Sequence, residues 1–173
     1  MSNGPLPRTG GHRTHLDARL RILKLLTTGS AVGVFGTMIL GSYTGAIGAG
    51  LACPDWPLCR GAIVPDFRQP GVAAEYAHRL FAAATSLLVL LTLVATLLWF
   101  RWDRRYVVLS VLSFLLLAGQ VTLGMVTITS GLDSLVVTGH LALATTVFGT
   151  TLTLAVMSLT AGPKRPALAA APA

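Results

Sequence analysis

The chain has 173 residues, of which 53% are hydrophobic and only 11% are charged, whereas soluble domains carry roughly 25% charged residues. This composition excludes an ordinary soluble domain and predicts an all-α integral membrane protein. The formal net charge of +7 does not indicate a nucleic-acid partner. Its basic residues gather beside apolar runs and are not spread along a polar face with interleaved aromatic side chains.

The N-terminal segment, residues 1–19, is rich in Gly, Pro, Thr, Arg and His and shows no apolar period. We interpret it as a disordered tail. It contains no short apolar core ending in small residues, so we expect no secretory signal. The first apolar segment, residues 20–43, predicts a membrane helix, with Lys24 close enough to its end for the ammonium group to reach water.

Residues 44–71 are too polar and too rich in Gly and Pro to cross a bilayer, and we expect one long loop there. Three further apolar segments follow, and each reaches the length of about 20 residues that a spanning helix needs. They are predicted at 72–100, 106–129 and 134–159. Residues 20–160 thus form a predicted four-transmembrane-helix bundle, and residues 161–173 a second tail.

The distribution of Lys and Arg predicts the orientation of this bundle. Basic residues concentrate in the N-terminal tail, in the turn at 101–105 and in the C-terminal tail. Because cytoplasmic segments carry the excess of positive charge, we expect both termini in the cytoplasm and the loop 44–71 outside. The expected location is the cell membrane, as a multi-pass protein in contact with membrane lipid.

Two histidines lie inside predicted helices. At about 1.5 Å per residue, His78 and His140 each lie roughly 9 Å from the outer start of their helix. A single such histidine can simply hydrogen-bond a neighbouring helix, but two at equal depth point to a shared ligand. Imidazoles from two helices of a bundle suit a haem iron. No Cys-x-x-Cys-His motif is present, so covalent attachment is not expected.

Charged residues near His78 are further candidates. Glu75 is the only glutamate of the chain and lies one turn from His78 on nearly the same helical face. It is a candidate proton acceptor, or a residue that orients a ligand, or a rim carboxylate paired with an arginine. Arg79 and Arg60 are candidates for haem propionates or for interfacial anchors. A di-iron site is excluded, since it needs several more carboxylates.

The two cysteines, Cys53 and Cys59, both fall in the predicted outer loop, where oxidising conditions allow a disulfide. That disulfide would be a structural clip or a redox-active pair. Two thiols alone do not make a zinc site.

These features together resemble the haem A synthase family. The resemblance covers about residues 41–148 and is carried by Gly50-Leu51-Ala52-Cys53-Pro54-Asp55-Trp56-Pro57-Leu58-Cys59-Arg60-Gly61, Pro65, Glu75-Tyr76-Ala77-His78-Arg79 and Gly139-His140-Leu141. Members of that family are eight-helix proteins with two similar halves. They oxidise a methyl group of haem O to the formyl group of haem A, using a haem b cofactor.

The resemblance implies that water supplies the oxygen and an external acceptor takes the electrons, for terminal oxidase assembly. It implies a site made of the cysteine pair, Glu75, His78 and His140, and possible partners in haem O synthase and the terminal oxidase. The chain departs from the family by its half length, which resembles compact four-helix members from archaea. It also has Gly45 where members usually carry a basic residue.

One four-helix unit offers two membrane histidines, whereas the family reaction needs a cofactor haem and a substrate haem. We therefore expect a homodimer or a larger homo-oligomer, in which Gly29 and Gly33 offer one possible contact face. Two other functions stay open. One is a bis-histidine electron-transfer or haem-carrier protein, and the other a membrane thiol-quinone oxidoreductase, which would normally need a second cysteine pair.

Overall fold

The computed structural model describes residues 10–161, which form four α-helices. They are α1 (Gly10–Ala46), α2 (Val72–Trp99), α3 (Arg104–Thr129) and α4 (Ser134–Thr160). Each contains a stretch long and apolar enough to cross a bilayer. The predicted all-α fold with four membrane spans is confirmed.

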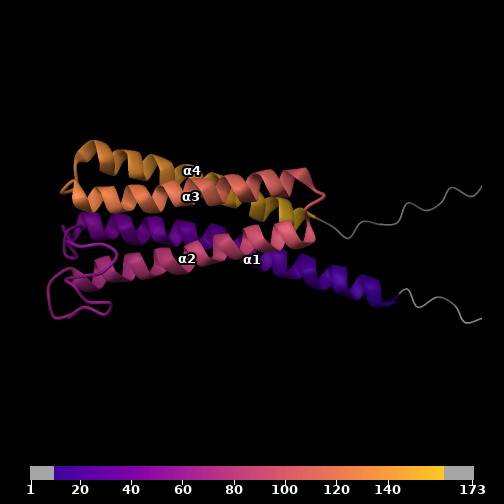
Figure 1. The fold of residues 1–173 in the computed structure, drawn as a ribbon, viewed down its shortest axis with the longest axis horizontal. Helices are drawn as coiled ribbons and strands as arrows, with labels where there is room; N and C mark the ends of the chain where they lie inside the picture. The colour runs from indigo at the N-terminus through magenta and orange to yellow at the C-terminus, as the bar shows by residue number, and fades with distance from the viewer. Residues whose placement is uncertain (1–9, 162–173) are drawn as a thin grey trace, which may run out of the picture.

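The helices run alternately up and down (Figure 1). The connection between α1 and α2 and the turn between α3 and α4 lie at one end, here called the loop end. The turn between α2 and α3 lies at the other end, with the last residues of α4. Helix α1 packs against α2 and α4, and α3 packs against α4 and less extensively against α2. Helices α2 and α4 are therefore diagonal neighbours.

Helix α1 is longer than the sequence predicts. It begins at Gly10, ten residues before the predicted start, and ends at Ala46. The predicted disordered tail is thus wrong for residues 10–19, while its remainder, like residues 162–173, lies outside the described part. Residues 15–19 are exposed, so no buried face marks them as helical. Extending an existing helix is much easier than nucleating one, and the apolar span supplies the nucleus.

The starts of the other helices follow from local chemistry. The Asp103 carboxylate accepts a hydrogen bond from the Arg105 N–H, and the Asp133 carboxylate accepts from the N–H groups of Leu135 and Val136. Such aspartates satisfy backbone donors that a helix start leaves free. Before α2, Gly71 has a φ of 76°, and a Cβ there would lie 2.7 Å from the Cβ of Ala49. Only glycine suits this junction.

Two apolar clusters hold the middle and the far end of the bundle. The middle cluster takes one buried side chain from each helix: Val34, Val89, Leu117 and Val147. The far cluster consists of Leu23, Tyr106 and Leu154. Hydroxyl pairs join the helices as well, with Oγ atoms 2.7 Å apart in Thr27 and Ser158 and 3.1 Å apart in Ser30 and Thr92. Hydrogen bonds of this kind are typical between membrane helices.

Candidate functional site

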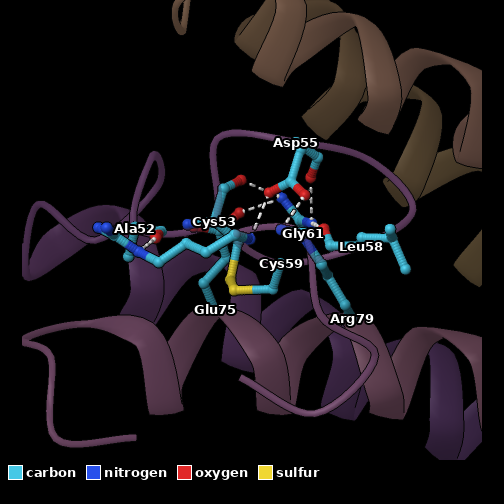
Figure 2. The surroundings of a disulfide bond; sticks show 9 residues. Ala52, Cys53, Asp55, Leu58, Cys59, Gly61, Glu75 and Arg79 are labelled. Atoms are coloured by element: carbon cyan, nitrogen blue, oxygen red, sulfur yellow. Dashed lines mark hydrogen bonds and ion pairs between the residues drawn. A yellow bond between two sulfur atoms is a disulfide. The ribbon is translucent and has the colours of Figure 1, made fainter. Parts of the chain in front are cut away.

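The site begins with a disulfide in the loop between α1 and α2. Cys53 and Cys59 are bonded, with their Cα atoms 4.5 Å apart, as Figure 2 shows. Both are almost fully buried and pack with Val72 of α2. The predicted disulfide is therefore present in the structure, where it closes a short loop that packs against the first turn of α2.

The Glu75 side chain, in the first turn of α2, binds the backbone of this loop. Its side chain is only 3% exposed, and its Oε2 accepts a hydrogen bond of 2.8 Å from the Cys53 N–H. Its Oε1 accepts from Nη2 of Arg79, one turn further along α2. Both carboxylate oxygens are thus engaged, one by the loop backbone and one by a cation. The pair satisfies a buried charge that would otherwise be costly.

Arg79 reaches further into the same loop (Figure 2). Its Nη1 donates to the carbonyl oxygens of Asp55, at 2.7 Å, and Leu58, at 2.8 Å. Its Nη2 donates to the carbonyl of Cys53 at 2.6 Å. One guanidinium therefore anchors three carbonyls of the loop. Both terminal nitrogens of Arg79 therefore already bond the loop. A contact between Arg79 and a haem propionate stays a prediction.

Asp55 organises the tip of the loop, a role that the sequence analysis missed. Its carboxylate accepts hydrogen bonds from the backbone N–H groups of Arg60 and Gly61. The Gly61 N–H lowers the pKa of Asp55 most, with further lowering from the Arg60 N–H and the charge of Arg79. The signal was available, since Asp after Pro between two cysteines is typical of a side chain that caps a turn.

The second arginine candidate, Arg60, lies on the exposed side of the loop. Its Nε donates to the carbonyl of Ala52 at 2.9 Å, and its backbone has a φ of 55°. Arg60 thus also bonds the loop backbone, while its terminal nitrogens lie at the loop end of the bundle. Its predicted role at a propionate stays a prediction.

The two histidines project from the diagonal helices α2 and α4, and each faces a glycine of a neighbouring helix. A Cβ built on Gly41 of α1 would lie 2.9 Å from Cε1 of His78. A Cβ built on Gly124 of α3 would lie 3.2 Å from Cε1 of His140. The missing side chains give each imidazole its space. The sequence analysis missed both glycines, whose only signal was a glycine inside an apolar helix.

The helix segments around these histidines contain no buried residue. These segments are 35–43, 76–84, 118–126 and 134–143. Buried residues resume on both sides, with Glu75 and Thr127 toward the loop and the middle apolar cluster below.

The histidines also have unused ring nitrogens. Nδ1 of His78 and Nδ1 of His140 are buried and have no hydrogen-bond partner within residues 10–161. Nε2 of His140 lies 3.2 Å from Nε2 of Gln120, on α3. Buried polar atoms in native proteins nearly always have partners, and these two nitrogens remain free to bind a ligand.

The set of donor atoms fits haem better than a bare metal ion. Across the described residues, no group of three or more His, Cys, Asp or Glu side chains gathers to hold an ion. A haem brings its own four nitrogens and needs only axial ligands, which imidazole supplies. Two diagonal histidines with two unpartnered buried nitrogens therefore fit the axial ligation of a haem between α2 and α4.

Comparisons with known proteins give independent information. A family model described as "Cytochrome oxidase assembly protein", COX15-CtaA, matches residues 66–172. The chain is 45% identical to a heme A synthase of Symbiobacterium thermophilum over 62 residues, which are 36% of this chain and 20% of that protein. It is 35% identical to a heme A synthase of Shouchella clausii over 94 residues, which are 54% of this chain and 31% of that protein.

The match to a heme A synthase of Geobacillus thermodenitrificans is longer. The two chains are 27% identical over 138 residues, which are 79% of this chain and 44% of that protein. The chain thus spans less than half the length of the curated relatives that it matches.

Proposed function

Because the chain belongs to the COX15-CtaA family of cytochrome oxidase assembly proteins, we propose that it acts in haem A synthesis as an oxidoreductase. The reaction would convert a methyl group of haem O, the substrate, to the formyl group of haem A, with water as the source of oxygen. The product would serve terminal oxidase assembly. The single observation that supports this best is the pair of histidines with unpartnered buried nitrogens on the diagonal helices α2 and α4.

In this proposal His78 and His140 would hold the iron of a haem b cofactor. That haem would supply the one-electron redox chemistry through which electrons leave the substrate for an external acceptor. The residues of the chain would bind and orient this haem. Gly41 and Gly124 leave space for the imidazoles, and Gln120 contacts the His140 ring.

The loop would cover the outer mouth of the haem layer. Glu75 and Arg79 tie it to α2, directly above His78 in the helix. The buried Glu75 carboxylate is the group proposed from the sequence to take up protons released during the oxidation.

The chain would lie in the cell membrane as a multi-pass protein with both termini in the cytoplasm. The fold supports this, because the basic turn at 101–105 lies at the end of the bundle opposite the disulfide loop (Figure 1). Positive charge at one end and a disulfide at the other match a cytoplasmic and an outer side.

The second haem would be held by a second copy. Two copies with the same orientation can form a closed two-fold dimer, in which the haem of one serves as cofactor to the substrate haem of the other. Gly29 and Gly33 are not the contact face expected from the sequence, since Cβ atoms there would meet Leu88 and Thr85 of α2 within the same chain. Native mass spectrometry in mild detergent tests the scheme, and full activity of a strict monomer would contradict it.

The function is tested by replacing the histidines and following both pigment and product. His78→Ala and His140→Ala are each expected to lose bound haem and to stop conversion of haem O to haem A in cells that make haem O. His15→Ala is the matched control, because His15 is exposed on the protruding start of α1 and should change neither.

The pigment extracted from the purified protein separates the alternatives. Haem b together with haem O or haem A supports the synthase. Haem b alone, with no conversion of supplied haem O, would assign a haem carrier or electron-transfer protein. A colourless protein that oxidises thiols would assign the thiol-quinone enzyme.

A further inference from the structure

A second polar site lies deep in the bundle, on the side away from the histidines. A cavity of about 10 Å³ lies between the four helices. Six of the eight residues that line it carry hydroxyl groups, and every helix contributes at least one of them: Thr27, Ser30, Thr92, Ser110, Ser113 and Thr151. All six side chains belong to buried residues. A polar cavity of this kind in the middle of a membrane span requires an occupant or an explanation.

Apolar side chains lie on either side of the cavity along the bundle. In α1, α3 and α4, its hydroxyls lie between a residue of the middle cluster and one of the far cluster. Val89 and Leu154, one from each cluster, also line the cavity. The middle cluster separates the cavity from the histidine layer.

The hydroxyl protons around the cavity are almost all in use. Ser110 donates to the carbonyl of Tyr106, Thr92 to that of Leu88, and Thr151 to that of Val147. Since Thr92 has donated its proton, the Ser30 hydroxyl is the donor in the bond between these two. Each of these oxygens keeps a lone pair that can accept. The wall is thus rich in acceptors.

Ser113 is the exception. Its side chain is 1% exposed, and its Oγ has no hydrogen-bond partner among the described residues. Its proton is therefore available in a cavity that otherwise offers acceptors. No hydroxyl bond joins α3 directly to another helix in this layer, since Ser110 bonds its own helix.

We propose that this cavity holds one water molecule, which accepts a hydrogen bond from Ser113 and donates to acceptors on the facing helices. The cavity volume is at the threshold for a single water, which needs about 10–15 Å³ and two to four polar partners. The water satisfies the orphan hydroxyl and links α3 to the hydroxyls of the other three helices. The middle and far apolar clusters lie on either side of it.

The proposal predicts whether the Tm rises or falls when Ser113 is replaced. If the cavity is wet, Ser113→Ala removes a partner of the water, and the Tm of the full-length protein in detergent should fall. If the cavity is dry, the same change removes a buried hydroxyl with no partner, so the Tm should rise or stay the same. Thr28→Val is the matched control, because Thr28 Oγ1 is also buried without a partner but lies outside the cavity lining. Its Tm should rise or stay the same.

The water itself is observed by solid-state NMR of the protein in lipid bilayers. A cross-peak from water to the Ser113 side chain is expected in the wild type and a much weaker peak at Thr28. Ser113→Val fills the cavity and should abolish water contacts at Thr151 as well.

Two results would overturn the proposal. One is a Tm that does not fall for Ser113→Ala, together with no water contact at Ser113. The other is a Tm that rises with sodium chloride but not with choline chloride, which would assign the cavity to a cation.

Discussion

At the scale of single residues, Arg79 carries more of the site than its position beside a histidine suggests. Its guanidinium bonds the loop carbonyls of Asp55, Leu58 and Cys53 and pairs with buried Glu75. Arg79→Ala would leave a buried carboxylate without its cation, and breaking a buried pair costs about 3–5 kcal/mol. We expect faster amide hydrogen exchange throughout the disulfide loop and, if the proposed function is correct, a loss of haem conversion.

Arg68 provides the control for this prediction. It pairs with Asp66 in the same connection, but its side chain is 91% exposed. Surface pairs contribute about 0–1 kcal/mol, so Arg68→Ala should leave exchange in the disulfide loop unchanged. Equal effects of the two substitutions would contradict the anchoring role of Arg79.

Asp55 makes the loop sensitive to acid. The Gly61 N–H, followed by the Arg60 N–H, holds the pKa of this carboxyl below its ordinary value of 3.8. A lowered folded-state pKa stabilises the fold above the unfolded pKa, near 3.9, and this contribution is lost as the pH falls through the folded value. The Gly61 amide should therefore exchange slowly at neutral pH and lose protection, after correction for intrinsic rates, below about pH 4.

Asp55→Asn should remove most of this pH dependence, because an amide oxygen can accept but does not titrate. Asp66→Asn serves for comparison. The pKa of Asp66 is also lowered, mainly by the Arg68 side chain, yet among the described residues the Asp66 carboxylate bonds only Arg68. Protection of Gly61 that falls in acid equally in the Asp55→Asn variant would rule out this carboxylate as the cause.

Residue types alone indicate part of the site. Two histidines at equal depth, a lone glutamate and a cysteine pair stand out in an apolar sequence because polar groups in a membrane are costly. Which of them touch could not be predicted. The hydrogen bonds from Arg79 to three carbonyls depend on the path of the loop. The space beside each histidine depends on which face of the neighbouring helix packs against it.

At the scale of elements, glycines decide how closely α1 can approach α2. A methyl group at Gly41 would come within 2.9 Å of the His78 ring, so the ring would have to move. Overpacking of this kind typically costs about 1–3 kcal/mol. If the proposed haem site is correct, Gly41→Ala should weaken haem binding by roughly 5- to 150-fold at that cost. Titration of haem into the purified protein measures the change.

Gly45 lies one turn further along the same helix and is exposed, and a Cβ there would meet nothing within 4 Å. Gly45→Ala should leave haem affinity unchanged and raise the Tm slightly, because Ala is better than Gly in a helix by about 1 kcal/mol. Weaker haem binding in both variants would point to the helix backbone and not to the space beside His78.

Apolar length was enough to predict four spanning helices, but it failed at the beginning of α1. Residues 15–19 are helical and exposed, so their sequence carries no periodic apolar signal. The starts of α3 and α4 were within two residues of the prediction, since charged and turn residues coincide there with capping aspartates. The exposed start of α1 has no comparable sequence signal.

At the scale of the whole molecule, the arrangement of the four helices makes a prediction about orientation. The disulfide loop and the basic turn at 101–105 lie at opposite ends of the bundle (Figure 1). After reduction, a membrane-impermeant maleimide should therefore label Cys53 and Cys59 in intact cells. Labelling that appears only after lysis would invert the proposed topology. A cysteine introduced at Trp102, which is 86% exposed, should show the opposite behaviour.

The seam between α1 and α4 has a consequence for the time course of assembly. Thr27 and Ser158 meet across 131 residues of chain, and Lys24 donates to the carbonyl of Leu159 at the same seam. At 5–20 residues per second, the ribosome needs roughly 7–26 s to make the intervening chain. During that interval the α1–α2 hairpin and its disulfide can form, while Thr27 and Lys24 of α1 lack their partners on α4. A newly made chain is therefore most exposed to quality-control proteases and to wrong helix partners before its last helix arrives.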